Sequence, residues 1–146
     1  MLLVRSRAGV ALSAQAGGIR PVSQQSAFVL GSLGYHAPSG VDGCGIHAQQ
    51  LQHDLGSASH LVLRNHGLLT VGASVADAFL AMYIFEATCA IQIRAQAGGS
   101  ELVPIDSSLV AAAQQQAAQV TRGMGAQLAW PGLLRRLDRR WPGYEA

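Results

Sequence analysis

Lysine is absent from this sequence of 146 residues, so all ten basic side chains are arginines. Charged residues of both signs make up only 12% of the chain, and the formal net charge is +2. A net charge this small creates no strong electrostatic field of one sign. We therefore expect neither a nucleic acid nor a membrane surface among the partners.

Cysteine is scarce as well. Cys44 and Cys89 are isolated from each other and neither belongs to a C-x-x-C motif, which excludes a disulfide framework. Free cysteines are typical of a reducing compartment, so we expect a cytoplasmic protein. Long apolar runs are also missing, because the longest, from Ala78 to Phe85, is far shorter than the roughly 20 residues that a membrane-spanning helix needs.

Apolar residues are nevertheless plentiful enough for a packed core. They make up 49% of the sequence, which is typical of a globular domain rather than a disordered chain. A chain of this length forms one domain without disulfide support. We expect a single domain over residues 1–146, without internal repeats.

The most informative stretch runs from Leu61 to Gly99. Two apolar runs, one of residues 61–63 and one of Leu68, Leu69 and Val71, predict strands that are buried on both faces. Between them lies the polar tripeptide Asn65-His66-Gly67. A polar histidine beside a glycine, between two buried strands, is the best candidate site in the chain, although the residues alone favour a structural histidine.

A long helix is predicted after the second strand. Ser74 and Asp77 have the spacing of a capping box, and Gly98-Gly99 is a helix stop, so the helix should span residues 74–97. Its apolar side is predicted at helical spacing. That side consists of Val75, Phe79, Met82, Glu86, Cys89 and Ile93.

The remaining elements follow from weaker local patterns. We expect strands at residues 2–4, 28–30 and 33–35, with a further edge strand conceivable at residues 103–105. Helices are expected at residues 7–16, 46–55, 107–122 and 126–140, the last interrupted at Pro131.

The titratable residues offer few combinations with recognisable chemistry. His36, His47, His53 and His60 are scattered, and the sequence contains no H-x-H or H-E-x-x-H motif. Glu86 is the single carboxylate on the predicted apolar side of the long helix. It is either a buried acid or base, or more commonly a group paired with an arginine or the backbone at a subunit contact.

The C-terminal segment from Leu133 to Trp141 contains four arginines close to two tryptophans. Such a segment could bind nucleic acid. Leu133, Leu137 and Trp141 recur at four-residue spacing, which favours an amphipathic packing helix with a solvated basic face.

The sequence resembles the C-terminal half of the class II aldolase/adducin domain. The segments LRNHGLLTVG and DAFLAMYIFEATCAIQIRAQAGG carry the family's order of strand, N-H-G turn, strand and long helix. The upstream segments RAGVALSAQ and PVSQQSAFVL keep the same order, and RGMGAQLAWPGLLRRLDRR is similar to one bacterial branch. The resemblance covers nearly the whole chain.

This resemblance implies a three-layer α/β/α sandwich, assembled as a homo-oligomer that is usually a tetramer. Aldolases of the family cleave small sugar-phosphate or hydroxy-carbonyl substrates with one Zn²⁺ held by three histidines. Two of these belong to an H-x-H motif, and the third is in the N-H-G turn, at the position of His66. Zn²⁺ acts there as a Lewis acid, and a glutamate from the first half of the domain is the general acid/base.

The sequence departs from the family pattern at the metal ligands. Counting back from Ala8-Gly9, the H-x-H positions fall on Leu3 and Arg5, and neither residue can ligate Zn²⁺. The first half of the family domain, which carries the catalytic glutamate, has no counterpart in this sequence. The catalytic residues therefore stay unknown. We therefore expect a domain truncated at its N-terminus, inactive as an aldolase and unable to retain Zn²⁺ alone. The alternative is a non-enzymatic module that oligomerises and binds actin filaments, like the head of adducin.

Overall fold

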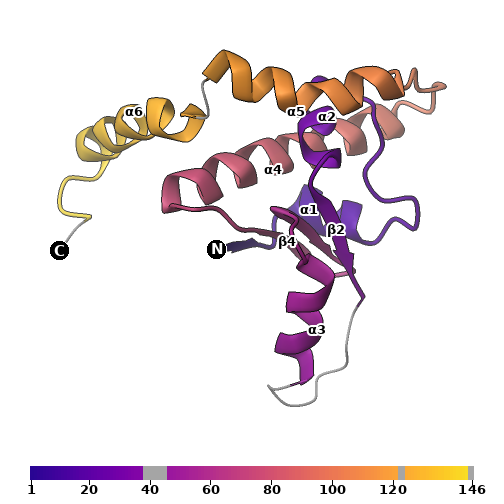
Figure 1. Cartoon of the computed structure of the whole chain (residues 1–146), viewed down its shortest axis with the longest axis horizontal. Helices are drawn as coiled ribbons and strands as arrows, with labels where there is room; N and C mark the ends of the chain where they lie inside the picture. Colours follow the sequence, from indigo (N-terminus) through magenta and orange to yellow (C-terminus); the bar gives the residue numbers. More distant parts are fainter. Residues whose placement is uncertain (38–45, 122–123, 145–146) are drawn as a thin grey trace.

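The computed structural model describes residues 1–37, 46–121 and 124–144 (Figure 1). These residues form four strands and six helices. In chain order the elements are β1 (Leu2–Val4), α1 (Arg7–Ser13), α2 (Gln24–Leu30), β2 (Leu33–His36), α3 (Ile46–Leu55), β3 (His60–Leu63), β4 (Gly67–Thr70), α4 (Val75–Ala97), α5 (Ser107–Thr121) and α6 (Gly125–Arg140).

The strands form one mixed sheet in the order β1-β4-β3-β2. β3 and β4 are the arms of an antiparallel hairpin, with Leu61 opposite Leu69 and Leu63 opposite Gly67. β1 lies antiparallel to β4 and places Val4 opposite Leu68, whereas β2 lies parallel to β3. The two strands predicted on either side of Asn65-His66-Gly67 are therefore confirmed, although β4 already begins at Gly67, and the N-terminal strand lies at one edge of the sheet.

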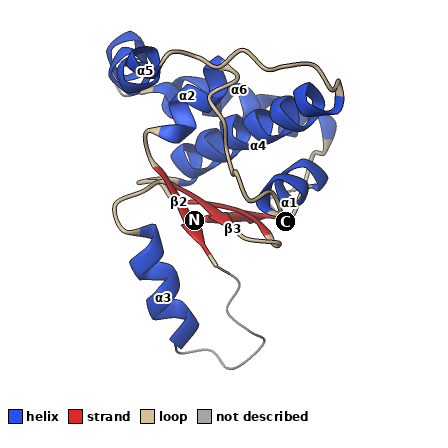
Figure 2. Ribbon diagram, turned by 90° about the vertical axis from the view of Figure 1, so that its right-hand side faces the viewer, coloured by secondary structure: helices blue, strands red, loops and turns tan. Residues whose placement is uncertain are grey.

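Helices lie on both faces of this sheet (Figure 2). α1, α2 and α4 cover one face, while α3 lies on the other and contacts β2. α5 packs on α2 and α6 packs on α4, so both are farther from the sheet (Figure 1). The arrangement is an α/β fold, as the resemblance implies.

The strands of the hairpin are buried on both faces, as their apolar runs predict. One face contributes Val62 and Leu68 to a core with Phe85 of α4. The other face contributes Leu61 and Leu69 to a smaller core, which includes Leu51 and Leu55 of α3.

α4 begins and ends as predicted, since Ser74 and Asp77 form a capping box and Gly98 follows the last turn. The predicted apolar side is confirmed at Met82 and Cys89 and wrong at Val75 and Phe79. Val75 and Phe79 are 68% and 37% exposed, and the buried side consists of Ala78, Met82, Phe85, Thr88, Cys89 and Gln92. Gln92 is accommodated in the core because its side chain bonds the backbone of Arg20 and Gly18.

The length and mean hydropathy of α4 would also suit a membrane-crossing helix. That criterion is met equally by core helices of folded domains. Here Phe85 and Cys89 of α4 are fully buried against the sheet and its neighbouring helices.

Other boundaries differ from the sequence prediction. Residues 28–30 belong to helix α2 rather than to a strand, because a capping box between Ser23 and Ser26 starts a helix at Gln24. α6 continues through Pro131 without interruption. Trp130, the residue before this proline, packs edge-on against Phe79 of α4, and such tertiary contact offsets the cost of an interior proline. Residues 103–105 form no strand.

Candidate functional site

The turn between β3 and β4 has a backbone that few residue types can adopt. Asn65 has a φ of 58° and Gly67 a φ of 151°. A side chain at Gly67 would clash with the carbonyl oxygen of Val4 in β1. The glycine therefore allows the turn to approach the end of β1 closely, and His66 is carried to the same place.

The structure brings His66 together with Arg5, one of the two predicted H-x-H positions. Nε of Arg5 donates a hydrogen bond to Nε2 of His66 over 3.0 Å. Both side chains are exposed. Because a guanidinium can only donate, Nε2 of His66 carries no proton in this contact and its lone pair is occupied by Arg5.

Leu3 occupies the other predicted position. It lies two residues before Arg5 on the extended N-terminal segment, opposite Leu69 of β4, and its side chain is 45% exposed. Leucine has no donor atom for a metal, and an arginine stays protonated at any ordinary pH.

The residues around His66 do not fit the Zn²⁺ that the family resemblance implies. Across residues 1–37, 46–121 and 124–144, no group of three or more histidine, cysteine, aspartate or glutamate side chains could hold a metal ion. Zinc sites in proteins need at least three such ligands acting together. His66 is thus a single imidazole whose only bonded neighbour at Nε2 is a cation.

Glu86 of α4 is half-buried. Its Oε2 accepts a hydrogen bond of 2.5 Å from the hydroxyl of Ser6. The same hydroxyl accepts a hydrogen bond from the backbone N–H of Gly9 and so caps α1. Glu86 therefore ties α4 to the start of α1, and its partner is a serine, rather than the arginine or backbone group expected from the sequence.

A second polar cluster, which the sequence did not indicate, joins β2 to α3. Nδ1 of the buried His36 lies 2.8 Å from Oδ2 of Asp54. The other oxygen of Asp54 is bonded by Gln50 and His53. Hydrogen bonds from His36 and then His53 lower the pKa of Asp54, so the carboxylate is ionised and holds α3 beside the sheet.

His60 and Cys89 have structural roles. His60 packs edge-on against Phe85, with the ring centroids 5.2 Å apart, and burial lowers the pKa of its imidazole. Burial likewise raises the pKa of the Cys89 thiol to about 12, which makes this thiol unreactive near neutral pH. Cys44 lies outside the described residues.

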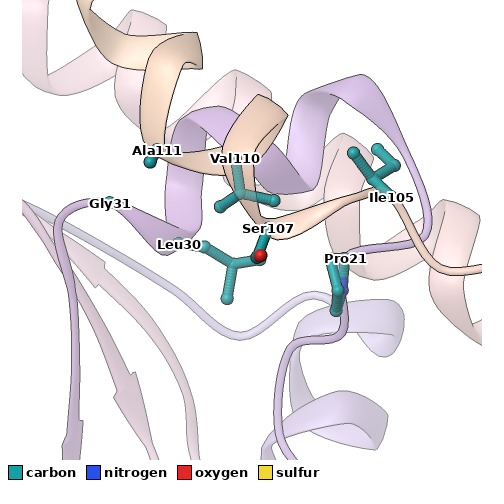
Figure 3. Close-up of a pocket in the computed structure, with 7 residues that line it drawn as sticks. All are labelled: Pro21, Leu30, Gly31, Ile105, Ser107, Val110 and Ala111. Atoms are coloured by element: carbon teal, nitrogen blue, oxygen red, sulfur yellow. The ribbon is translucent and has the colours of Figure 1, made fainter.

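A hollow of about 540 Å³ lies elsewhere, between α2 and α5 (Figure 3). Leu30, Val110, Ile105 and Pro21 form most of its wall, and the hydroxyl of Ser107 is its polar side-chain group. Of the histidines whose side chains the structure describes, none lines this hollow. It offers an apolar surface without acid, base or metal-ligand chemistry.

The basic C-terminal segment forms helix α6, as predicted. Its four arginines, Arg135, Arg136, Arg139 and Arg140, are exposed. Trp130 packs on α4, whereas Trp141 at the end of the helix is 63% exposed. The solvated basic face agrees with the prediction, whereas the predicted apolar stripe does not, since Leu133 and Trp141 are 36% and 63% exposed and the helix contacts α4 through Trp130 instead.

Comparison with known proteins gives a consistent assignment. Residues 3–93 match the family model described as the class II aldolase and adducin N-terminal domain. A Pseudomonas aeruginosa protein named as an aldolase class 2 protein is 49% identical over 147 residues, which cover 99% of this chain and 57% of that protein. Rat alpha-adducin is 39% identical over 107 residues, which cover 70% of this chain and 14% of the adducin.

Solved structures agree with these relatives. A crystal structure of an aldolase II superfamily protein from Pseudomonas syringae is 39% identical and has a TM-score of 0.85, over 94% of this chain and 55% of that chain. L-fuculose 1-phosphate aldolase from Glaciozyma antarctica is 25% identical, with a TM-score of 0.65 over 76% of this chain and 41% of its own. The chain thus spans little more than half the length of its bacterial relatives.

Proposed function

This chain belongs to the class II aldolase and adducin family, and we propose that it is a member without metal-dependent aldol chemistry of its own. The family is generally zinc-dependent, and its aldolases act on small sugar-phosphate or hydroxy-carbonyl substrates. In this proposal the chain keeps the fold and the position of the third zinc ligand, but it lacks the other two ligands.

The observation that supports the proposal is the hydrogen bond between Arg5 and His66. A divalent cation bound at Nε2 of His66 would have to displace a guanidinium that already occupies the lone pair. It would also sit within a few ångströms of that positive charge, where the repulsion between like charges opposes binding. A single imidazole supplies too little affinity to overcome both costs.

Zinc titration of the purified chain tests this proposal, with isothermal titration calorimetry as the readout. We expect no binding that depends on His66, so the wild-type chain and a His66→Ala variant should give the same titration. A double substitution, Leu3→His with Arg5→His, supplies the missing residue types on the N-terminal segment. That variant should gain a zinc site that is lost again when His66 is also replaced by alanine.

Retro-aldol turnover on sugar phosphates with added Zn²⁺ is the functional measurement. We expect no turnover above the rate of the His66→Ala variant. Stoichiometric zinc binding by the wild-type chain that requires His66, or turnover that requires it, would contradict the proposal.

The alternative function is that of a non-enzymatic interaction module similar to the adducin head. The 39% identity with alpha-adducin over 70% of this chain supports it. If it is right, the purified chain should co-sediment with actin filaments. A chain that stays in the supernatant at every actin concentration would exclude this alternative.

We also propose that this chain forms a homo-oligomer and that it works in a reducing, cytoplasmic setting. The outer side of α4 supports the homo-oligomer, because Val75, Phe79 and Tyr83 recur every fourth residue and are 68%, 37% and 67% exposed. Exposed apolar residues in a row are typical of contact surfaces. Sedimentation velocity should therefore detect a homo-oligomer, and Tyr83→Glu should shift it toward monomer. A monodisperse wild-type monomer would contradict this part.

A further inference from the structure

We propose that Arg5, held by His66, is a binding site for a small oxyanion, the carboxylate or phosphate group of a metabolite. The inference rests on the proposed function, because it assumes that no metal ion competes for His66. It goes further by assigning a ligand class to the residues that replace the metal site.

The first argument is that Arg5 is fixed in position. Its backbone follows directly after β1, where Val4 pairs with Leu68, and the missing side chain of Gly67 lets the turn lie against it. Nε of its guanidinium is then anchored on His66 at 3.0 Å. An anchored guanidinium loses less conformational freedom when it binds a ligand than a freely moving one does.

The second argument is that, among the described residues, most of the guanidinium has no hydrogen-bond partner. Arginine has five N–H donors in one plane, and the anchoring hydrogen bond uses a single one, at Nε. The edge formed by the two terminal amino groups has the geometry that binds a carboxylate or phosphate through two parallel hydrogen bonds. Arg5 is exposed, so a ligand can reach this edge from solvent.

The third argument is that the charge of Arg5 is not neutralised within the described part of the chain. The ion pairs found in residues 1–37, 46–121 and 124–144 involve only Asp54, far away on α3. Among these residues, Glu86 accepts a hydrogen bond from Ser6, the residue after Arg5, but forms no ion pair with Arg5 itself. The site therefore presents a positive charge to solvent.

The chemistry selects oxyanions over other ligands. A planar, always protonated donor cannot bind a cation and gains little from a neutral hydroxyl group. Because the site is exposed, the gain from one bidentate ion pair is modest, and we expect weak binding with dissociation constants on the order of 100 mM. Carboxylates and phosphates share this recognition, so the experiment compares both.

NMR titration of the ¹⁵N-labelled, EDTA-treated chain tests the inference, with inorganic phosphate and acetate as separate probes at constant ionic strength. We expect saturable shifts of the amide signals of residues 5, 66 and 67. Arg5→Gln should abolish these shifts, and His66→Ala should weaken binding about threefold to tenfold because the anchor is lost. Arg7→Gln removes an exposed arginine two residues away and should leave binding unchanged.

The outcomes are distinct from those of the zinc experiment. Shifts with phosphate alone would assign the site to phosphorylated compounds, and shifts with both probes would assign it to oxyanions in general. Non-saturable shifts, or equal losses in Arg5→Gln and Arg7→Gln, would overturn the inference and leave the proposed function standing. Zinc binding through His66 would overturn the proposed function. The anion titration does not test that function, because it is carried out without metal.

Discussion

Strand β3 has a histidine close to each end, and the two histidines have opposite surroundings. His60, the first residue of the strand, is buried and lies edge-on against Phe85. His66, in the turn after the strand, is exposed and accepts a hydrogen bond from Arg5. His66, at the position of a family zinc ligand, is thus the less constrained histidine. His60, which has no such counterpart, is part of the core.

This difference separates what the fold needs from what a site needs. The core around Phe85 requires His60 to be neutral and packed, and burial lowers the pKa of His60 accordingly. The His66 side chain is exposed, and its hydrogen bond within the described residues is with Arg5, so the described core does not depend on it. Changes at the His60 end should therefore affect stability, and changes at the His66 side chain should affect ligand binding alone.

Phe85→Ala should cause the largest loss of stability, because Phe85 packs against His60 in the core. It removes a fully buried ring between α4 and the sheet, and such substitutions cost roughly 3–5 kcal/mol of the free energy of unfolding. Urea denaturation followed by circular dichroism measures the loss. Phe85→Leu is a smaller change to use if the alanine variant does not fold. Phe79→Ala is the matched control on the same helix, since Phe79 is 37% exposed, and an equal loss there would contradict the comparison.

Gly67→Ala tests the backbone at the other end of β3. The φ of 151° and the clash with the Val4 carbonyl oxygen should destabilise the turn by roughly 1–3 kcal/mol. The same denaturation experiment applies. Gly17→Ala is the control, because a side chain at Gly17 meets no other atom within 4 Å. If both variants are equally stable, the turn does not require glycine.

The features that the sequence predicted correctly depend on neighbouring residues. The hairpin and the ends of α4 follow from apolar runs and from the capping pair Ser74 and Asp77, which are close together in the chain. The strand predicted at residues 28–30 is wrong. The prediction followed the apolar residues there and did not use the capping box at Ser23, which starts helix α2. Local signals conflict there, and packing of α2 on α4 and α5 decides between them.

The features that the sequence missed depend on residues far apart in the chain. Arg5 and His66 are separated by 61 positions, and the side chain of Asp54 reaches His36 across 18. The family resemblance pointed to Arg5, but only as a residue unable to bind zinc. That Arg5 bonds His66 follows from the register of β1 on β4, which no local pattern encodes.

Acidification should destabilise the fold through the buried His60. The pKa of His60 is lowered from its ordinary value of 6.5, so the unfolded chain binds a proton more readily than the folded one. The stabilisation is complete above pH 6.5 and is lost as the pH falls through the folded pKa. Urea denaturation between pH 7.5 and 5 should show this decline. His60→Gln should flatten the decline, and an unchanged decline in that variant would contradict the role assigned to the buried imidazole.

Arg5→Gln should have the smallest effect on stability. Arg5 is exposed, and its described contact is one hydrogen bond with an exposed partner, so the free energy of unfolding should change by less than about 0.5 kcal/mol. The same substitution should abolish the anion-dependent amide shifts, whereas Phe85→Leu should lower stability and leave those shifts in place. Measuring both quantities on both variants tests whether the two ends of β3 are independent. A large loss of stability in Arg5→Gln would mean that the pair is part of the fold rather than a site upon it.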